Sequence, residues 1–541
     1  MRVRDHPYFL KMPGFGRGFG ASKYAPGFYG ICVNGDCSES FFMPGPREVV
    51  DLTGIAAGFR VIKAVKHVNV WMLATTNGTD TKIYRQETTW VVRATIASRV
   101  ATDMVSFKSV LAVAFGSTNP YQFSTQTGAE AYTFTASTKT AGNSDSANYF
   151  AVQSNGRILS RVAYVTNPNE LYFTEDLTNG DTTGSTKTVI GDTDSSNSYT
   201  TSITEDDTGK LIIGMRRALW SIGRNGEPEK LTEDFPDGVA DAGGQGDRKN
   251  FESYTEIEGR IYYIFSGDEV MEYDHGEVNR FMAPKWQGQD IPRAHLPANA
   301  ITRVGNKIML AIGSANTATL KDVTHARGGT SRVSNQFTTA SELYVGWYAE
   351  DPVDGQRRFA WHGVILTCTS LLRYMWFDED TDYLYLSSGA SESADLQQRR
   401  CLYTKDNALY HQKSSAIVRA TGTAQLEILG IDMGLPFYLK RAARLKLATT
   451  RLGTSSSLPS MEPEYKITGD FDNTTFESDF VLFTENSDAA TGRDFPSRSD
   501  FLTMDLRFVE TGNGTDNTYG VLWEAELELD EVFTQKTSRP R

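Results

Sequence analysis

An acidic run with alternating carboxylates is the first place to look for chemistry. Phe377-Asp378-Glu379-Asp380-Thr381-Asp382 begins like a calcium-binding loop, in which carboxylate oxygens at alternate positions surround the ion. The helix-flanked form of that loop needs glycine at its sixth position and a bidentate glutamate at its twelfth, where this chain has Tyr383 and Gly389. The run is therefore predicted to be an acidic hairpin turn between Met375-Trp376 and Tyr383-Leu384.

The other residue types that bind metals are spread thinly. Seven histidines occur without metal-ligand spacing, at His6, His67, His275, His295, His325, His362 and His411. Cys32 and Cys37 are close enough to pair or to share a metal, but no second pair of cysteines lies nearby, which favours free thiols in a reducing cytoplasm. The acidic segment 469–473 is predicted to be a turn. We expect neither a metal nor another cofactor.

Motifs for catalysis are missing from the sequence. It contains no His-Glu-x-x-His, no phosphate-binding glycine loop ending in Lys-Ser or Lys-Thr, and no Gly-x-Ser-x-Gly. The repeated Ser-x-Asp-x-Gly-x-Thr-Trp turns of sialidases are also missing. Glycosidases use two carboxylates about 5 to 9.5 Å apart, and 67 acidic residues offer many pairs that sequence alone cannot test. The prediction is a protein that is not an enzyme.

Charge and hydropathy exclude further classes. A net charge of -13 argues against a general grip on nucleic acid, which needs clustered lysine and arginine. No uncharged apolar stretch approaches the roughly 18 residues that span a bilayer. The opening MRVRDHPYFLKMPGFGRGFG lacks the continuous apolar region of a secretory signal peptide. At 541 residues the chain is expected to hold two or three domains.

Strand patterns run through nearly the whole chain. Short alternating runs rich in β-branched and aromatic residues recur, as at 68–73, 260–265 and 383–386. Turn signals such as Asn77-Gly78 and Asn513-Gly514 separate them, because both central residues of a type I′ turn need a positive φ. These alternations predict antiparallel meanders and an all-β protein.

The meanders repeat along the chain. A turn, a glycine, a basic residue and two apolar residues recur at Gly156, Gly209 and Gly259, with spacings of 209 − 156 = 53 and 259 − 209 = 50 residues. Gly305 marks a looser copy. A second strand with a central aromatic follows, and Trp220 and Tyr273 are expected at equivalent, packed points. The wide gap that follows is predicted to hold an insertion at 343–348.

A period of about 40 to 50 residues with four strands is typical of a propeller blade. The copies predict a six- or seven-bladed β-propeller over residues 48–423, since stacking blades in a ring buries both faces of each sheet and hides the strand edges. Unrelated β-sandwiches in series remain the competing interpretation. Longer, more widely spaced strands over 424–541 predict a C-terminal antiparallel β-sandwich with a polar tail.

The first 47 residues form a third region, in which glycine alternates with aromatic residues. Such a segment is either a disordered start or an arm that orders against a partner, and its aromatic side chains favour the arm. The residues predicted to dock it are Arg2, Arg4, Phe9, Phe15, Arg17 and Phe19.

Several segments carry a resemblance. "NELYFTEDL" (169–177) and "ALWSIGRNGEPEKLTEDF" (218–235) resemble propeller proteins in the virions of tailed bacteriophages. "LGIDMGLPFYLKRAARLKL" (429–447), "LTMDLRFVE" (502–510) and "VLWEAELELDEV" (521–532) are similar to the sandwich that ends some of those chains. The resemblance lies more in the spacing of strands and turns than in identical residues.

The resemblance implies a structural protein of the virion tail, such as a nozzle, adaptor or tail tip, assembled in the host cytoplasm. Its implied partners are other virion proteins and copies of itself in a ring around the tail axis, with room for contact with the host surface. From the sequence we expect neither a membrane span nor sequence-specific binding to nucleic acid. The alternative is a secreted or surface propeller that binds or hydrolyses polysaccharide, which a pair of carboxylates at the propeller axis would favour.

Overall fold

The structure, a computed structural model, describes the strands of the chain and most of the short turns between them. Forty-one strands and no helix occur among these residues. The described residues are 8–10, 14–15, 28–29, 31–36, 42–46, 49–50, 54–116, 119–137, 146–154, 156, 158–161, 170–178, 187–190, 200–215, 217–223, 226–233, 251–265, 269–281, 298–313, 341–350, 357–368, 372–388, 398–402, 423–431, 440–452, 460–468, 491–494, 500–501, 503–511 and 519–532.

Five consecutive four-stranded antiparallel sheets follow one another along the chain, each a simple meander. Sheet 1 consists of β8 (Arg60–His67), β9 (Val70–Thr76), β10 (Thr81–Gln86) and β11 (Trp90–Ile96). Sheet 2 consists of β12 (Asp103–Phe107), β13 (Val110–Ala114), β14 (Gln122–Ser124) and β15 (Thr135–Ala136). Sheet 3 consists of β16 (Phe150–Val152), β17 (Ile158–Arg161), β18 (Glu170–Thr174) and β19 (Lys187–Val189). Sheet 4 consists of β20 (Thr200–Glu205), β21 (Leu211–Met215), β22 (Leu219–Ile222) and β23 (Pro228–Lys230), and sheet 5 of β24 (Tyr254–Ile257), β25 (Arg260–Phe265), β26 (Glu269–Asp274) and β27 (Glu277–Phe281).

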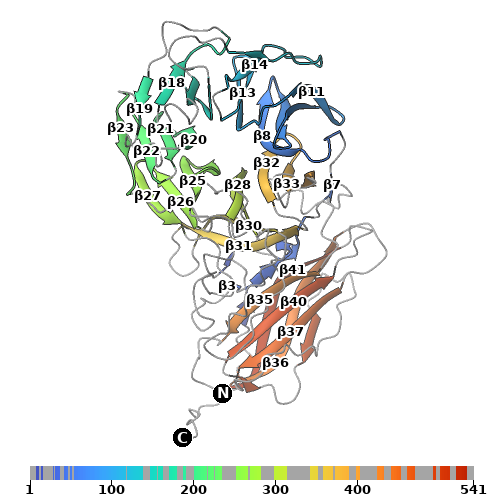
Figure 1. Ribbon diagram of the computed structural model, residues 1–541. Helices are drawn as coiled ribbons and strands as arrows, with labels where there is room; N and C mark the ends of the chain where they lie inside the picture. Colours follow the sequence, from blue (N-terminus) through green and yellow to red (C-terminus); the bar gives the residue numbers. More distant parts are fainter. Residues whose placement is uncertain are drawn as a thin grey trace.

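Two further sheets complete a ring (Figure 1). Sheet 6 is β28 (Ala298–Val304), β29 (Lys307–Gly313), β30 (Ser341–Glu350) and β31 (Arg357–Cys368). Sheet 7 is β32 (Leu372–Asp378), β33 (Tyr383–Ser388), β34 (Gln398–Leu402) and the distant β7 (Val49–Val50). The prediction of an insertion at 343–348 is wrong, because these residues lie in β30, which pairs with β29 and β31.

The first strand of each meander lies toward the centre of the ring. There β8 lies against β12, β12 against β16, β16 against β20, β24 against β28, β28 against β32, and β32 back against β8. The apolar clusters of the ring lie between neighbouring sheets, since Met72 and Ile83 of sheet 1 share a cluster with Leu111 and Val113 of sheet 2. A ring of four-stranded meanders that bury their faces against each other is a β-propeller. The all-β prediction and its propeller are confirmed.

The glycine repeat lies where the sequence places it, in the turn between the first and second strands. Gly156, Gly209 and Gly259 have φ of 82°, 82° and 77°, a region that glycine enters without strain. Trp220 and Tyr273 were expected at equivalent positions of sheets 4 and 5, but their positions relative to the repeat glycines differ by two residues. Trp220 pairs with Ile213, four residues after its repeat glycine, whereas Tyr273 pairs with Ile261, two residues after its own. Both still pack, Tyr273 fully and Trp220 partly.

Sheet 6 does not end at the ring. Its outer strand β31 pairs with β4 (Ile31–Val33), and β4 pairs with β35 (Thr423–Ile431). β35 pairs with β40 (Thr503–Thr511), and β40 pairs with β37 (Ser460–Thr468), which gives one eight-stranded sheet. Val33 is the link, paired with Val364 of β31 on one side and with Gln425 of β35 on the other. The ring and the C-terminal region therefore share a sheet, and a segment from residues 31–33 joins them.

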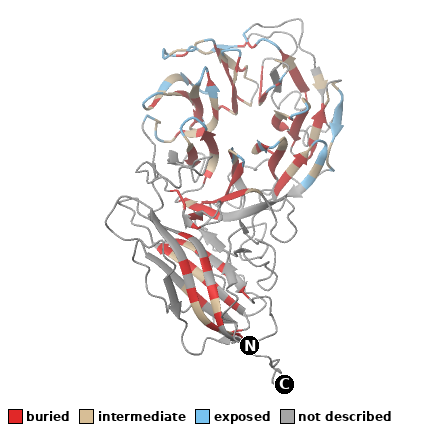
Figure 2. Ribbon diagram, turned by 180° about the vertical axis from the view of Figure 1, so that it is seen from behind, coloured by how far each residue is buried: buried red, intermediate tan, exposed pale blue. Residues whose placement is uncertain are grey.

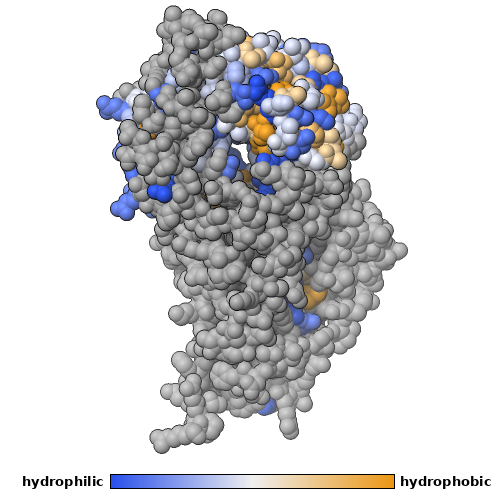
Figure 3. Space-filling model, in the orientation of Figure 1, coloured by the Kyte–Doolittle hydropathy of each residue, from blue (hydrophilic) through white to orange (hydrophobic). Residues whose placement is uncertain are grey.

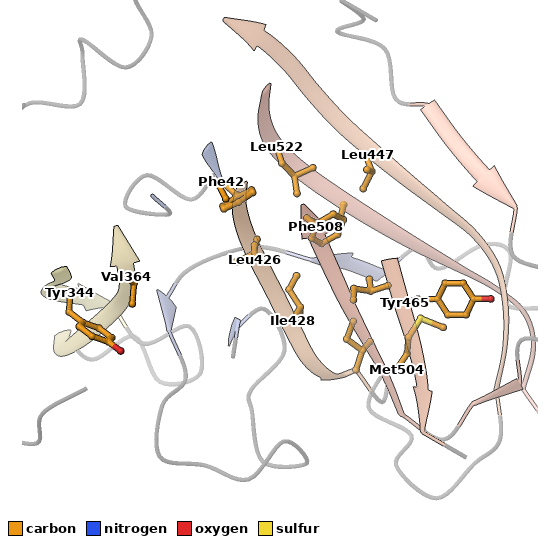
Figure 4. Close-up of a cluster of buried hydrophobic side chains, with 14 of the residues drawn as sticks. Phe42, Tyr344, Val364, Leu426, Ile428, Leu447, Tyr465, Met504, Phe508 and Leu522 are labelled. Carbon is orange, nitrogen blue, oxygen red and sulfur yellow. The ribbon is translucent and has the colours of Figure 1, made fainter. Parts of the chain in front are cut away.

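A second antiparallel sheet completes the C-terminal region. It contains β1 (Tyr8–Leu10), β41 (Tyr519–Val532), β36 (Lys440–Leu452), β38 (Thr491–Asp494) and β39 (Asp500–Phe501). Apolar side chains from the two sheets, among them Leu426, Phe508, Leu447 and Leu522, form one buried cluster (Figure 4). Phe42 belongs to it, fully buried and hydrogen-bonded to Leu522 through both backbone groups at 2.9 and 2.8 Å.

The same cluster extends into the ring. Tyr262 of sheet 5 and Ile308, Tyr344 and Val364 of sheet 6 belong to it together with the C-terminal residues. The view of burial from behind shows buried residues running from the ring into the C-terminal strands (Figure 2). The remaining short strands are β2 (Gly14–Phe15), which pairs in parallel with β3 (Phe28–Tyr29), and β5 (Gly35–Asp36), which pairs with β6 (Met43–Pro44).

Candidate functional site at the axis of the ring

The acidic run at residues 377–382 is a hairpin turn, as predicted. Asp378 pairs with Tyr383 at the end of β32 and β33. The Asp378 carboxylate accepts hydrogen bonds from the backbone N–H of Asp380 at 3.2 Å and from the Thr381 hydroxyl at 2.6 Å, so it organises the turn itself. Asp380 forms an exposed ion pair with Lys66 of sheet 1 at 2.6 Å. The run is used in folding the turn and in bridging two sheets.

Other predicted ligand types fall partly outside the described residues. In the part of the chain that the structure describes, no group of three or more His, Cys, Asp or Glu residues is placed to hold a metal. Segment 469–473 and Cys37 lie outside it; Cys32 is in β4, and Cys368 of β31 is buried. The described part also has no helix long and apolar enough to cross a membrane.

A polar cluster at the axis of the ring was not foreseen from the sequence. Lys63, Asp103 and Tyr374 lie on the first strands of sheets 1, 2 and 7, each four residues before the last paired residue of its strand. Because the first strands line the axis, equal positions on them bring the three side chains together. β-Bulges beside Lys63 and Tyr374 adjust where these side chains point.

The geometry of this axial cluster ties four sheets together. The Lys63 ammonium lies 3.5 Å from an Asp103 carboxylate oxygen. The Asp103 carboxylate also accepts hydrogen bonds from the backbone N–H of Met104 at 2.9 Å and of Phe150, in sheet 3, at 2.8 Å. The Tyr374 hydroxyl accepts one from the backbone N–H of Ala64 at 3.1 Å. Sheet 7 is thus bonded to sheet 1, and sheet 1 to sheets 2 and 3.

Electrostatics in the cluster favour its charged pair. Asp103 raises the pKa of Lys63 against the opposing effect of desolvation, with smaller contributions from Tyr254 and Tyr374. Burial raises the pKa of Tyr374. The Asp103 side chain is 6% exposed and that of Lys63 is 34% exposed, so Lys63 is the more accessible member of the pair. A hollow with hydrophilic residues at its edge marks the middle of the ring (Figure 3).

One end of the ring carries a belt of polar contacts between sheets. The turn between the first two strands of one sheet reaches toward the next sheet in the chain. His67 contacts the Ser106 hydroxyl at 2.8 Å and the Gln126 carbonyl at 3.1 Å, both in sheet 2. Lys108 donates to the Glu175 carbonyl of sheet 3 at 3.1 Å. We call this end the turn face.

The belt continues through sheets 3 to 6. Ser154 donates two hydrogen bonds to the Glu205 carboxylate of sheet 4, from its backbone N–H at 2.6 Å and its hydroxyl at 3.0 Å. His275 of sheet 5 contacts Asp207 of sheet 4 at 3.0 Å. Arg260 of sheet 5 donates to the Tyr348 hydroxyl of sheet 6 at 2.6 Å. Neighbouring sheets are therefore fixed to each other by directional contacts as well as by apolar packing.

The predicted docking arm is only partly described. Phe9 lies in β1 and pairs with Glu526 of β41, and Phe15 lies in β2 and pairs with Tyr29 of β3. Arg2, Arg4, Arg17 and Phe19 lie outside the described residues. The strand pairing places parts of the first 47 residues in sheets of the chain itself. Docking of the arm on a partner stays a prediction.

Known proteins add little to this picture. No family model and no curated protein matches the chain. Similar solved structures include the extracellular domain of a hybrid two-component system from B. thetaiotaomicron (12% identity, TM-score 0.37), where the match covers 65% of this chain and 39% of that one. YCF48 bound to D1 peptide (11% identity, TM-score 0.39) is matched over 66% of this chain and 96% of its own, and BBS1N in complex with ARL6DN (12%, TM-score 0.39) over 67% and 99%. At such identities and TM-scores the likeness says nothing of function, and the fold rests on the strand pairing.

Proposed function

We propose that this chain is a structural component of a bacteriophage virion, a tail protein of the nozzle, adaptor or tail-tip kind that assembles around the tail axis. In this proposal the ring is a seven-bladed β-propeller made of sheets 1 to 7, and the C-terminal region is a β-sandwich. The N-terminal residues join the two and carry the arm that docks on other virion proteins or on another copy of the chain.

The observation that carries the proposal is the junction between the ring and the C-terminal region. One sheet runs through both, and one apolar cluster with Phe42, Tyr344 and Leu426 is common to both. Domains joined by linkers move relative to each other, whereas a shared sheet and core hold two parts in a fixed orientation. A fixed orientation suits a building block of a particle more than it suits a catalyst, and the sequence resemblance points to the same class.

Assembly tests the proposal. Deleting residues 1–30 removes β1, β2 and β3 but keeps Phe42 and β4, so the ring should stay folded while incorporation into the particle or ring is lost. Native mass spectrometry of the full-length chain and of the deletion variant, followed by electron microscopy of phage particles assembled in their presence, measures this. Normal incorporation of the deletion variant would remove the assembly role from the arm, and a full-length chain that enters no particle would refute the virion role.

The alternative, a propeller that binds or hydrolyses polysaccharide, has one observation in its favour. The Lys63 side chain is 34% exposed and lies near Tyr374, and a partly exposed cation with aromatic neighbours suits a polar ligand. The carboxylate in this cluster, Asp103, is paired with Lys63. Binding of soluble oligosaccharides that is lost in Lys63→Ala, measured by calorimetry, would support this alternative over the virion role.

A further inference from the structure

One residue on the turn face lies between two carboxylates of different sheets. His275, at the tip of the hairpin between β26 and β27, has its Nδ1 2.6 Å from an Asp274 oxygen of its own sheet. Its Nε2 lies 3.0 Å from one Asp207 oxygen and 3.2 Å from the other, and Asp207 belongs to the turn that follows β20 in sheet 4. The imidazole therefore bridges sheets 4 and 5.

The protonation state of His275 follows from these partners. A neutral imidazole has one N–H, so it can donate to only one of two carboxylates, and the other contact then sets a lone pair against a negative oxygen. An imidazolium donates from both nitrogens. We propose that His275 is a pH-sensitive clasp between sheets 4 and 5. It is closed onto Asp207 when the imidazole is doubly protonated and is released from Asp207 when the imidazole loses a proton.

The Asp207 side of the clasp is held in place by the turn that carries it. Asp206 accepts hydrogen bonds from the backbone N–H of Thr208 at 3.0 Å and of Lys210 at 2.8 Å, and its second oxygen accepts one from the Tyr273 hydroxyl at 3.0 Å. These bonds do not involve His275, so they keep the turn close to sheet 5 when the imidazole is neutral. The contact of Asp207 with a doubly protonated His275 adds to them and further stabilises the seam between the two sheets.

Glycine at position 259 is part of the same arrangement. The Asp207 carboxylate lies over Gly259, where a Cβ atom would come within 2.6 Å of it, and Gly259 has a φ of +77°. Glycine thus supplies both the backbone conformation of the sheet 5 turn and the space into which Asp207 reaches. The repeat glycine of sheet 5 has a role that its counterpart Gly156, with open space around its Cβ position, does not have.

The charges around His275 favour its protonated form. Hydrogen bonding to Asp274, then the charge and hydrogen bond of Asp207, raise the pKa of His275. His275 in turn lowers the pKa of Asp274, with help from Arg260, whose Nε lies 2.9 Å from the second Asp274 oxygen. The turns packed around the imidazole also carry Asp206, Lys210, Glu258 and Glu277.

The pH window follows from these directions. The folded-state pKa of His275 lies above its ordinary value of 6.5, so the contribution of the clasp is complete below that value and is lost as pH rises through the raised pKa. At the acid end the lowered pKa of Asp274 keeps that carboxylate ionised below its ordinary 3.8. The clasp is therefore closed below pH 6.5 and opens as the pH rises through the raised pKa of His275.

Histidine-selective labelling of the full chain tests the proposal. The Cε1–Hε1 signals are followed by NMR from about pH 5 to 9 and assigned with His275→Gln. We expect the His275 midpoint above 6.5 in the wild type and a lower midpoint in Asp207→Asn, which keeps the size of the side chain and removes its charge. Ser154→Ala, which removes a hydroxyl contact with Glu205 between sheets 3 and 4, is the control and should leave the midpoint in place. A wild-type midpoint at or below 6.5, or one unchanged in Asp207→Asn, overturns the clasp.

Hydrogen exchange tests the mechanical half of the proposal. Peptides covering 206–215 and 269–281 should exchange about two- to fivefold more slowly at pH 6 than at pH 8.5, after correction for the intrinsic rate, because the closed clasp limits local opening. The ratio should fall to about one in His275→Gln, while peptides from sheet 1 behave alike in both proteins. The same pH ratio in wild type and His275→Gln would show that the imidazole titrates without holding the seam.

Discussion

The seam between sheets 7 and 1 and the seam between sheets 4 and 5 join neighbouring parts of the same ring by different means. At the first, Trp376 stacks on Tyr385 with centroids 4.8 Å apart and planes 6° apart, and Trp90 meets both edge-on at 6.4 and 6.1 Å. At the second, carboxylates of one turn reach the hydroxyl of Tyr273 and the imidazole of His275.

The difference follows from what each seam must do. Sheets 4 and 5 are consecutive in the chain, so the connection between them already limits their separation. Sheets 7 and 1 lie at the two ends of the chain segment that forms the ring, and the chain links them only through the two-residue strand β7, which pairs with β34 and precedes β8. Buried aromatic area is large and insensitive to pH, and so it suits the seam that closes the ring. Polar contacts contribute less and respond to protonation.

The largest effect is expected at the closing seam. Trp376 is 5% exposed, and Trp376→Ala should lower the free energy of unfolding by about 3 to 5 kcal/mol through lost burial and a cavity. Urea unfolding followed by circular dichroism measures it. Val92→Ala in sheet 1, at a position 39% exposed, is the control and should change stability by less than about 0.5 kcal/mol. Equal effects of the two substitutions would mean that the aromatic cluster does not close the ring.

A partly buried tryptophan should have an intermediate effect. Trp220 packs against the cluster between sheets 3 and 4 with one face, and Lys230 lies over its ring at 5.9 Å. Trp220→Ala should therefore cost about 1.5 to 3 kcal/mol, less than full burial would give. The same unfolding experiment decides it. A loss as large as that of Trp376→Ala would place Trp220 in a tighter environment than its packing indicates.

The axial cluster should contribute less than the aromatic seam and more than an exposed ion pair. Asp103→Ala leaves the backbone N–H of Phe150 without its acceptor and should cost about 1 to 3 kcal/mol. Lys66→Ala, which removes an exposed pair with Asp380, should cost about 0 to 1 kcal/mol. Thermal unfolding of the two variants at one pH compares them. The reverse order would mean that Asp103 is not a tie between sheets.

Two histidines should give pH dependences of opposite sign. Burial lowers the pKa of His67, so its seam between sheets 1 and 2 loses stability as pH falls below the ordinary 6.5. His275 has a raised pKa, and its seam loses stability as pH rises. Unfolding at several pH values should show that His67→Gln flattens the acid side and His275→Gln the alkaline side. A change on the same side for both would contradict the assignment of opposite protonation states.

The smallest expected effect is that of chelation. The Asp378 carboxylate accepts hydrogen bonds from Thr381 and from the backbone of the turn. Prolonged treatment with a chelator should therefore leave the melting temperature unchanged. Differential scanning calorimetry measures it, with added calcium as the reverse test. A fall of several degrees would reveal a structural ion, and variants at Asp378 and Asp470 would then locate it.

Local features of the fold could be predicted from the sequence. Alternating apolar residues and positive-φ glycines fix strands and turns within a few residues of each other, which is why the repeat at Gly156, Gly209 and Gly259 was found. Two turns of the same kind were seen only weakly, because Val68-Asn69 and Lys108-Ser109 take positive φ without glycine. A positive φ is uncommon outside glycine, most of all for a β-branched residue such as Val68, so tertiary contacts must support it.

Contacts between distant residues could not be predicted. Nothing local to Val33 shows that it lies between Val364 and Gln425, or that Phe42 enters the core of the C-terminal region. The axial cluster is of the same kind. Lys63 and Asp103 are ordinary surface-type residues in sequence, and only the shared register of the first strands brings them together. Lys63 and Asp103 each lie the same number of residues before the turn that follows their strand, and this shared position is the sequence signal that could have indicated the cluster.

The two-residue strand β7 is synthesised long before its partner strand β34, so sheet 7 can be completed only late in synthesis. Val50 pairs with Arg399, so the partners are separated by 399 − 50 = 349 residues. At roughly 5 to 20 residues per second, a ribosome delivers the second partner roughly 20 to 70 s after the first. Sheets 1 to 5 can form during that interval, but sheet 7 cannot be completed. A nascent chain halted before residue 399 should therefore carry a folded but open arc, whose exposed sheet faces are a target for chaperones.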